Sequence, residues 1–122
     1  MTTEKIIMII DDNATNLTLA SDVLELEGFR VVRCSDAEGA LAAIGEKHPD
    51  LILTDIALPG IDGLELTRML KANDTTRQIK IIALTAFAMK QDHEKALAAG
   101  CDGFITKPID TRRFKDQITP YL

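Results

Sequence analysis

Five residues that could act on one substrate follow apolar runs in this sequence. Asp11 and Asp12 come directly after five apolar residues, and Asp55 comes just after another apolar run. Thr85 and Lys107 occupy similar places after two later runs. Such side chains suit phosphoryl chemistry if they meet, because carboxylates bind cations while a lysine and a hydroxyl bind phosphate oxygens. Taken singly, each has an ordinary explanation, since Asp is a common turn residue and Thr is frequent in strands.

A shared cleft would bring three carboxylates together, and like charges there repel one another. Either one carboxylate keeps a proton or a cation lies between them. Oxygen ligands favour a hard cation such as Mg²⁺, and no His or Cys belongs to the group to suggest zinc. Mg²⁺ keeps coordination positions open for phosphate oxygens, and an Asp carboxylate can attack phosphorus to form an aspartyl-phosphate. The chemistry predicted for a shared site is phosphoryl transfer.

These residues can act together only if the fold brings the ends of the apolar runs to one place. The strand-like runs are Ile6–Ile10, Phe29–Val32, Leu51–Leu53, Lys80–Leu84 and Gly103–Ile105. Helical patterns separate and follow them at Ala14–Glu27, Ala37–Glu46, Gly63–Ala72, Lys90–Ala99 and Thr111–Tyr121. Strands that alternate with helices predict a doubly wound α/β fold, with a parallel sheet covered by helices on both faces.

Capping residues agree with this division. Asp36 and Thr111 are suitable helix N-caps, and Gly28 and Gly100 stand where helices commonly end. In an open α/β sheet, ligands bind beyond the carboxyl ends of the strands. The three carboxylates, the hydroxyl and the lysine are therefore expected to converge on one edge of the sheet.

Composition narrows the class of protein. The 122 residues are 46% hydrophobic, and residues 1–122 are expected to form a single domain. A net charge of −5 argues against a nucleic-acid-binding surface, and no apolar run is long enough to cross a membrane. Cys34 and Cys101 lie far apart outside any metal or redox motif, which is typical of reduced thiols in a cytoplasmic protein.

Four blocks of the sequence resemble the successive motifs of a bacterial response-regulator receiver domain. They are "IIMIIDDN", "PDLILTDIALPGIDGLEL", "IIALTAFA" and "AGCDGFITKPID", and they span nearly the whole chain in the expected order. The resemblance implies a flavodoxin-like fold, with a five-stranded parallel sheet in the order 2-1-3-4-5 and five helices.

The same resemblance assigns roles to the acidic residues. Asp55 corresponds to the phosphoacceptor. Asp12 corresponds to a direct Mg²⁺ ligand, and Asp11 to the acidic residue that acts mainly through water. The backbone carbonyl of Ala57 corresponds to a further ligand. Mg²⁺ is the cofactor implied.

Three later residues correspond to the parts of a conformational switch. Thr85 matches the hydroxyl that moves onto the phosphate, and Lys107 matches the phosphate-pairing lysine. The bond before Pro108 is expected to be cis. Phe104 stands at the position of an aromatic that swings inward on activation, although an aromatic in the last strand can also be simple core.

The function implied is a signalling switch of a two-component system or phosphorelay. A histidine kinase or histidine phosphotransfer protein would donate the phosphoryl group, and an unidentified downstream protein would bind the changed surface of Lys90–Tyr121. The protein would catalyse its own phosphorylation and slow dephosphorylation as a monomer. We expect a stand-alone receiver without an effector domain, similar to chemotaxis and cell-cycle regulators, although a receiver excised from a hybrid kinase would look the same.

Two other functions compete with this interpretation. A haloacid-dehalogenase-like phosphohydrolase also uses Asp, Mg²⁺ and Lys, but it needs a second Asp where this chain has Ala57. A pseudo-receiver that only binds partners would be expected to lack an acidic residue, the Thr or the Lys. Ala57 and Phe87 are apolar where many receivers have polar groups, so the phosphate lifetime does not follow from the resemblance.

Two further expectations concern the surface. His48 and His93 are predicted to be surface residues without a phosphohistidine role. In the helix predicted for Ala14–Glu27, apolar residues spread over about half of the circumference, which is wider than packing on a sheet requires. Part of this apolar surface is either free for a partner or covered by neighbouring helices.

Overall fold

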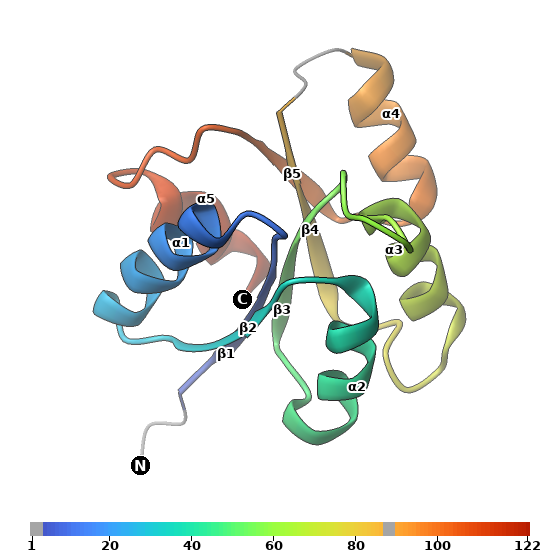
Figure 1. Cartoon of the computed structure of the whole chain (residues 1–122), viewed down its shortest axis with the longest axis horizontal. Coiled ribbons are helices and arrows are strands. Elements are labelled where there is room, and N and C mark those ends of the chain that lie inside the picture. The colour runs from blue at the N-terminus through green and yellow to red at the C-terminus, as the bar shows by residue number, and fades with distance from the viewer. Residues whose placement is uncertain (1–3, 87–89) are drawn as a thin grey trace.

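One parallel five-stranded sheet organises the chain in the computed structural model, which describes residues 4–86 and 90–122. The strands are β1 (Ile6–Ile10), β2 (Arg30–Cys34), β3 (Leu51–Asp55), β4 (Lys80–Thr85) and β5 (Gly103–Thr106). Their order across the sheet is β2-β1-β3-β4-β5, as predicted (Figure 1). Phe87, predicted to border the phosphate, lies outside the described residues.

Helices cover both faces of the sheet (Figure 1). They are α1 (Ala14–Leu26), α2 (Ala37–Lys47), α3 (Gly63–Ala72), α4 (Lys90–Ala99) and α5 (Phe114–Ile118), and a 3₁₀ turn at Thr119–Tyr121 follows α5. The first and last helices, α1 and α5, pack on one face, and α2, α3 and α4 pack on the other. Within 4–86 and 90–122, every helix is too short or too polar to cross a bilayer.

Two apolar cores result from the alternation of side chains along the central strands. Ile7 and Ile9 of β1 face α1 and α5, whereas Met8 and Ile10 face the other helices. All five residues of β3 are buried. A strand covered on both faces must be apolar throughout, which explains the continuous apolar runs that identified β1, β3 and β4.

The last helix is shorter than predicted. α5 begins at Phe114 rather than near Thr111, and Thr111 does not cap it. Asp110 holds the preceding segment in a turn, because its carboxylate accepts a hydrogen bond from the backbone N–H of Arg112. The other predicted cap is confirmed: Asp36 accepts a bond from the N–H of Gly39 at the start of α2.

Gly28 and Gly100 follow α1 and α4 with φ angles of 94° and 108°. Most side chains avoid this left-handed region, so glycine is favoured where a helix must stop and reverse into a strand. The predicted helix ends are confirmed at both positions.

Candidate active site

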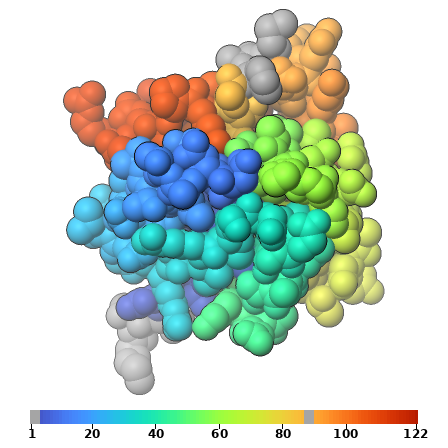
Figure 2. All heavy atoms as spheres, viewed as in Figure 1, coloured from blue at the N-terminus to red at the C-terminus, as the bar shows by residue number. Residues whose placement is uncertain are grey.

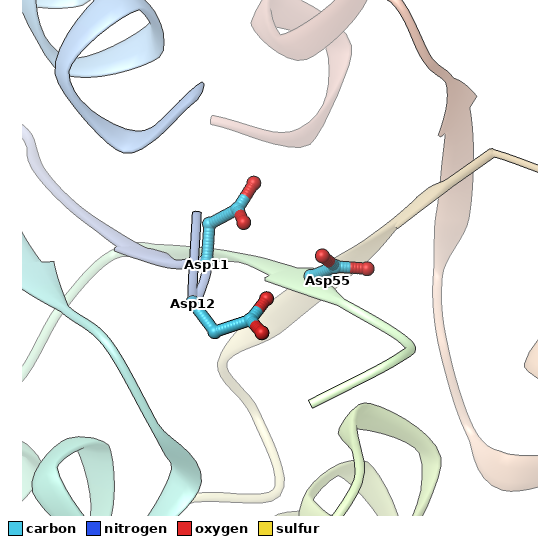
Figure 3. Close-up of side chains that lie close together, drawn as sticks. All are labelled: Asp11, Asp12 and Asp55. Atoms are coloured by element: carbon cyan, nitrogen blue, oxygen red, sulfur yellow. The ribbon is translucent and has the colours of Figure 1, made fainter. Parts of the chain in front are cut away.

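Three carboxylates meet at the carboxyl ends of β1 and β3. Figure 3 shows Asp11 and Asp12 beside the end of β1, with Asp55 across from them at the end of β3. One carboxylate oxygen from each residue lies within 4.8 Å of those of the other two. The convergence expected from the strand ends is therefore present, and it places like charges close enough to require compensation.

Lys107 supplies part of that compensation. Its Nζ donates to Asp55 Oδ2 over 2.9 Å and to Asp11 Oδ2 over 3.0 Å. Burial of the ammonium lowers the pKa of Lys107, but the hydrogen bonds and the attraction of Asp55 and Asp11 outweigh burial and raise its pKa overall. The lysine is therefore held charged between the two carboxylates.

Both oxygens of Asp11 are engaged. Besides the bond to Lys107, Oδ1 accepts a bond from the backbone N–H of Asn13 over 2.9 Å. The side chain of Asn13 in turn accepts from the N–H of Asn16 and caps α1. Asp11 is 2% exposed. The Asp12 side chain is exposed, and within residues 4–86 and 90–122 it makes no hydrogen bond or ion pair.

A tight loop positions Asp55. Its Oδ1 accepts a hydrogen bond from the N–H of Ala57 over 3.1 Å. The N–H of Gly63 donates to the carbonyl of Ile56 over 2.9 Å and closes the loop. A Cβ at Gly63 would collide with the carbonyl oxygen of Asp55. Asp62 then caps α3 by accepting a hydrogen bond from the N–H of Glu65, which fixes the start of the helix that follows the loop.

Thr85 and Lys107 are linked through the main chain. Thr85 is 2% exposed at the end of β4, and its carbonyl accepts a bond from the N–H of Lys107 over 2.7 Å. The bond between Lys107 and Pro108 is cis, as the resemblance implied. This bond ties the main chain at Lys107, whose side chain pairs with Asp55, to the end of β4.

The position of Phe104 was predicted, but its partner was not. Phe104 is 37% exposed on β5 and stacks on His93 of α4, with ring centroids 3.6 Å apart. The prediction that His93 is a surface residue holds only in part, because the residue is half-buried and its ring packs on Phe104. Sequence pattern does not indicate this contact, because it depends on how α4 is placed over β5. His48 is exposed, as predicted.

A partly apolar groove adjoins the acidic residues. It has a volume of about 280 Å³ and is lined by Asn16, Leu19, Ala86, Lys107, Pro108 and Ile109. Figure 2 shows the red segment after β5 lying against the blue start of α1. Asn16 and Ile109 were not predicted as site residues. The spacing of apolar residues in α1 indicates a broad apolar surface, but it does not indicate which segment of the chain packs beside that surface.

The oxygen donors suit a hard divalent cation. Among the described residues, the Asp12 carboxylate has no hydrogen-bond or ion-pair partner, and an oxygen of Asp55 lies within 4.8 Å of one of its oxygens. Ala57 lies in the loop beside Asp55 and donates its N–H to that carboxylate. Such donors are typical of Mg²⁺, which binds few carboxylates and keeps several waters. The charge of the pocket also favours a bound cation, because the single positive charge of Lys107 cannot neutralise three carboxylates.

The sequence matches the model of the response regulator receiver domain over residues 7–119. The chain belongs to the response regulator receiver family. Receiver domains bind Mg²⁺ at an acidic pocket, and Asp11, Asp12 and Asp55 form such a pocket here.

A curated relative covers nearly the whole chain. The polar-differentiation response regulator DivK of Brucella ovis is 45% identical over 118 residues, which make up 97% of this chain and 96% of that protein. This level of identity over full length supports the assignment to response regulators rather than to dehalogenase-like phosphohydrolases.

Solved receivers share the fold. A putative response regulator from Chloroflexus aurantiacus is 27% identical, with a TM-score of 0.93 and 98% of both chains covered. The receiver domain of sensor histidine kinase PA1611 from Pseudomonas aeruginosa is 31% identical, with a TM-score of 0.88 and 98% of both chains covered. That structure has a magnesium ion coordinated in the active site cleft.

Proposed function

We propose that this protein is a phosphorylation-dependent signalling switch that accepts a phosphoryl group on Asp55. The observation that carries the proposal is the position of Lys107, whose ammonium bridges Asp55 and Asp11 beside the third carboxylate of Asp12. This arrangement presents a nucleophilic carboxylate together with a fixed positive charge for phosphate oxygens.

Mg²⁺ would be held by Asp12, Asp55 and the backbone carbonyl of Ala57. Asp11, whose oxygens accept bonds from Lys107 and from the N–H of Asn13, would act mainly through water, as the resemblance to receivers implies. The bound ion would neutralise charge on the phosphoryl oxygens during transfer. Within residues 4–86 and 90–122 the exposed carboxylate of Asp12 makes no hydrogen bond or ion pair, so it is the group best placed to supply a direct ligand.

The transfer step follows from the chemistry of Asp55. An Asp55 carboxylate oxygen attacks phosphorus, and the phosphorus–nitrogen bond of a phosphohistidine breaks as the new phosphorus–oxygen bond forms. The electron pair of the broken bond stays on the imidazole nitrogen of the donor, which then takes up a proton. Lys107 already donates to Asp55 and would follow the charge onto the phosphoryl oxygens.

The response to phosphorylation would begin at Thr85. Its hydroxyl would bond to the new phosphoryl group, and the space that it leaves would admit Phe104 from the same face of the sheet. The surface formed by α4, β5 and α5 would then change and bind a downstream partner. The ring of Phe104 carries no hydroxyl, so an inward position leaves no polar group to satisfy in the core.

The phosphodonor would dock on α1 beside Asp55. Leu19 is 45% exposed and lines the groove next to Lys107, so the apolar surface of α1 is not fully covered by neighbouring helices. An apolar contact next to the acceptor suits a histidine kinase or a histidine phosphotransfer protein. The relative named as a polar-differentiation response regulator supports a role in two-component signalling.

Phosphorylation by acetyl phosphate and Mg²⁺, followed by intact mass measurement, tests the proposal. The wild-type protein should gain one phosphoryl group, and Asp55→Asn should gain none. Asp50→Asn is the matched control, since Asp50 is a nearby carboxylate in the chain that bonds to the N–H of Ile6 instead. Wild-type labelling of Asp55→Asn would reject Asp55 as the acceptor.

A further inference from the structure

The imidazole of His93 lies flat against the ring of Phe104. Their centroids are 3.6 Å apart and their planes differ by 21°. His93 belongs to α4 and Phe104 to β5, so the stack joins a helix to the edge strand of the sheet. It is a contact outside the acidic pocket, and the transfer chemistry does not use it.

The stack lies on the face of the sheet that carries Thr85. In the register of β4 and β5, Phe104 pairs with Ala83, so both side chains point toward α4. Thr85 lies two residues beyond Ala83 and therefore on the same face. Ala83 and Thr85 are both buried on this face of the sheet, while His93 contacts the Phe104 ring from α4.

One atom of the stack lacks a partner. Among the described residues, Nε2 of His93 is buried without a hydrogen bond. With a proton it is an unmatched donor, and without one it is an unmatched acceptor, so the stacked position carries a desolvation cost in either tautomer. Stacking holds the two rings together, whereas the unmatched nitrogen opposes that arrangement.

We propose that His93 is a positioning residue that holds Phe104 in its outward position and thereby sets how readily the switch responds to phosphorylation. The proposal rests on the proposed function, because it concerns the aromatic that follows Thr85. In the outward state, the rings stack and Nε2 stays unmatched. When Phe104 turns inward, the stack breaks and Nε2 gains access to water.

Two substitutions of His93 should act in opposite directions. His93→Ala removes the stacking partner, so the ratio of inward to outward Phe104 should rise about two- to tenfold, the range expected for an aromatic pair. His93→Phe keeps a stacking ring and removes the unmatched nitrogen, so the ratio should fall below the wild-type value. Lys95→Ala, at an exposed position of the same helix, should leave it unchanged.

Solvent exposure of the Phe104 ring shows whether His93 stabilises the outward position of the ring or only shields the ring from solvent. Paramagnetic broadening of its ring signals by a soluble gadolinium chelate would be measured with and without saturating beryllofluoride and Mg²⁺. If His93 holds the ring outward, His93→Ala reduces the broadening because the ring moves inward. If His93 only covers the ring, the same variant increases the broadening in both conditions, and the proposal is overturned.

Amide spectra of the same samples test the proposed function separately from the role of His93. Amide signals of Asp55 and Ala57 report beryllofluoride binding independently of Phe104. Their failure to respond would reject the proposed function, while the comparison of His93→Ala with His93→Phe in the unmodified protein would still decide the role of His93. Equal broadening in wild type, His93→Ala and His93→Phe would also overturn the positioning role.

Discussion

Lys107 reaches Asp55 across the end of an intervening strand. Its Nζ lies 2.9 Å from Asp55 Oδ2, although β4 separates β5 from β3 in the sheet. The main-chain hydrogen bond from Lys107 to Thr85 fixes the segment after β5 beside the end of β4, and the long side chain of Lys107 spans the remaining distance to Asp55. The acidic pocket is therefore stabilised by the ammonium group of Lys107, a residue that follows the edge strand β5.

Removing the ammonium group of Lys107 should destabilise the metal-free protein. In Lys107→Met, Asp11 and Asp55 lose their shared partner, and we expect a loss of about 1–3 kcal/mol in the free energy of unfolding. Urea unfolding in EDTA measures the loss. Lys80→Met is the control, since Lys80 is 54% exposed and its Nζ lies 4.0 Å from Asp102, a contact worth little.

Magnesium should narrow the difference between Lys107→Met and wild type, because a bound cation offsets the same carboxylate repulsion. Equal stabilities of the two proteins in EDTA would show that Lys107 does not compensate the pocket.

The stabilising effect of Lys107 should disappear at high pH. Its pKa is raised in the folded protein, so its contribution is complete below the unfolded-state pKa of about 10.4 and is lost as pH rises through the higher folded value. The difference in unfolding free energy between wild type and Lys107→Met should therefore be constant from neutral pH to about pH 10 and shrink above it. A constant difference through pH 12 would contradict the ion pair.

Asp12 should matter more for Mg²⁺ than for folding. Asp12→Ala removes the exposed carboxylate of the pocket and should weaken Mg²⁺ binding at least tenfold, a typical effect of losing a metal-site interaction. Without metal, the same change relieves repulsion and should stabilise the fold. Titration with Mg²⁺, with Glu46→Ala as the distant control, measures the first effect. Equal affinities of the two variants would exclude Asp12 as a ligand.

The residues at the strand ends were predictable because burial of the sheet on both faces strongly restricts where strands can begin and end. A parallel sheet buried on both faces requires continuous apolar runs, and its ligands bind where those runs end, so Asp11, Asp55 and Lys107 could be placed together from the sequence. The strand order came from the resemblance to receivers, because hydrophobic pattern alone does not reveal which strands are neighbours.

Contacts between side chains on different elements were not predictable in the same way. The stack of His93 on Phe104 depends on the placement of α4 over β5, and a histidine in a charged helix gives no sign of it. The start of α5 was misplaced for a related reason. Thr111 is a good cap by residue type, but Asp110 bonds to the N–H of Arg112 and continues the turn.

Gly63 should tolerate no side chain. In Gly63→Ala the new Cβ would collide with the carbonyl oxygen of Asp55, so the loop that positions the acceptor must shift. We expect a loss of at least about 2 kcal/mol, together with weaker Mg²⁺ binding. Gly45→Ala is the contrast, because a Cβ there meets no atom within 4 Å and helix propensity should stabilise α2 by about 0.5–1 kcal/mol.

Thermal or urea unfolding of both glycine variants compares them directly. A Gly63→Ala protein as stable as wild type would mean that the loop can move at no cost.

The phosphodonor should bind to the apolar surface of α1 at the end of that surface near the acidic pocket. Leu19 lines the groove beside Lys107, and Leu26 lies seven residues later on the same side of the helix, 89% exposed. Leu19→Glu would place a charge in the proposed contact and should slow phosphoryl transfer from an autophosphorylated histidine kinase at least tenfold, because buried unpaired charges oppose association. Leu26→Glu should transfer at close to the wild-type rate.

Acetyl phosphate provides the internal control for this comparison, because a small donor needs no docking surface. Both leucine variants should react with it as the wild type does, which would show that the acidic pocket is intact. Loss of transfer from the kinase with normal reaction with acetyl phosphate would place the donor on the groove end of α1. If Leu19→Glu accepts phosphate from the kinase as fast as Leu26→Glu does, the donor docks elsewhere.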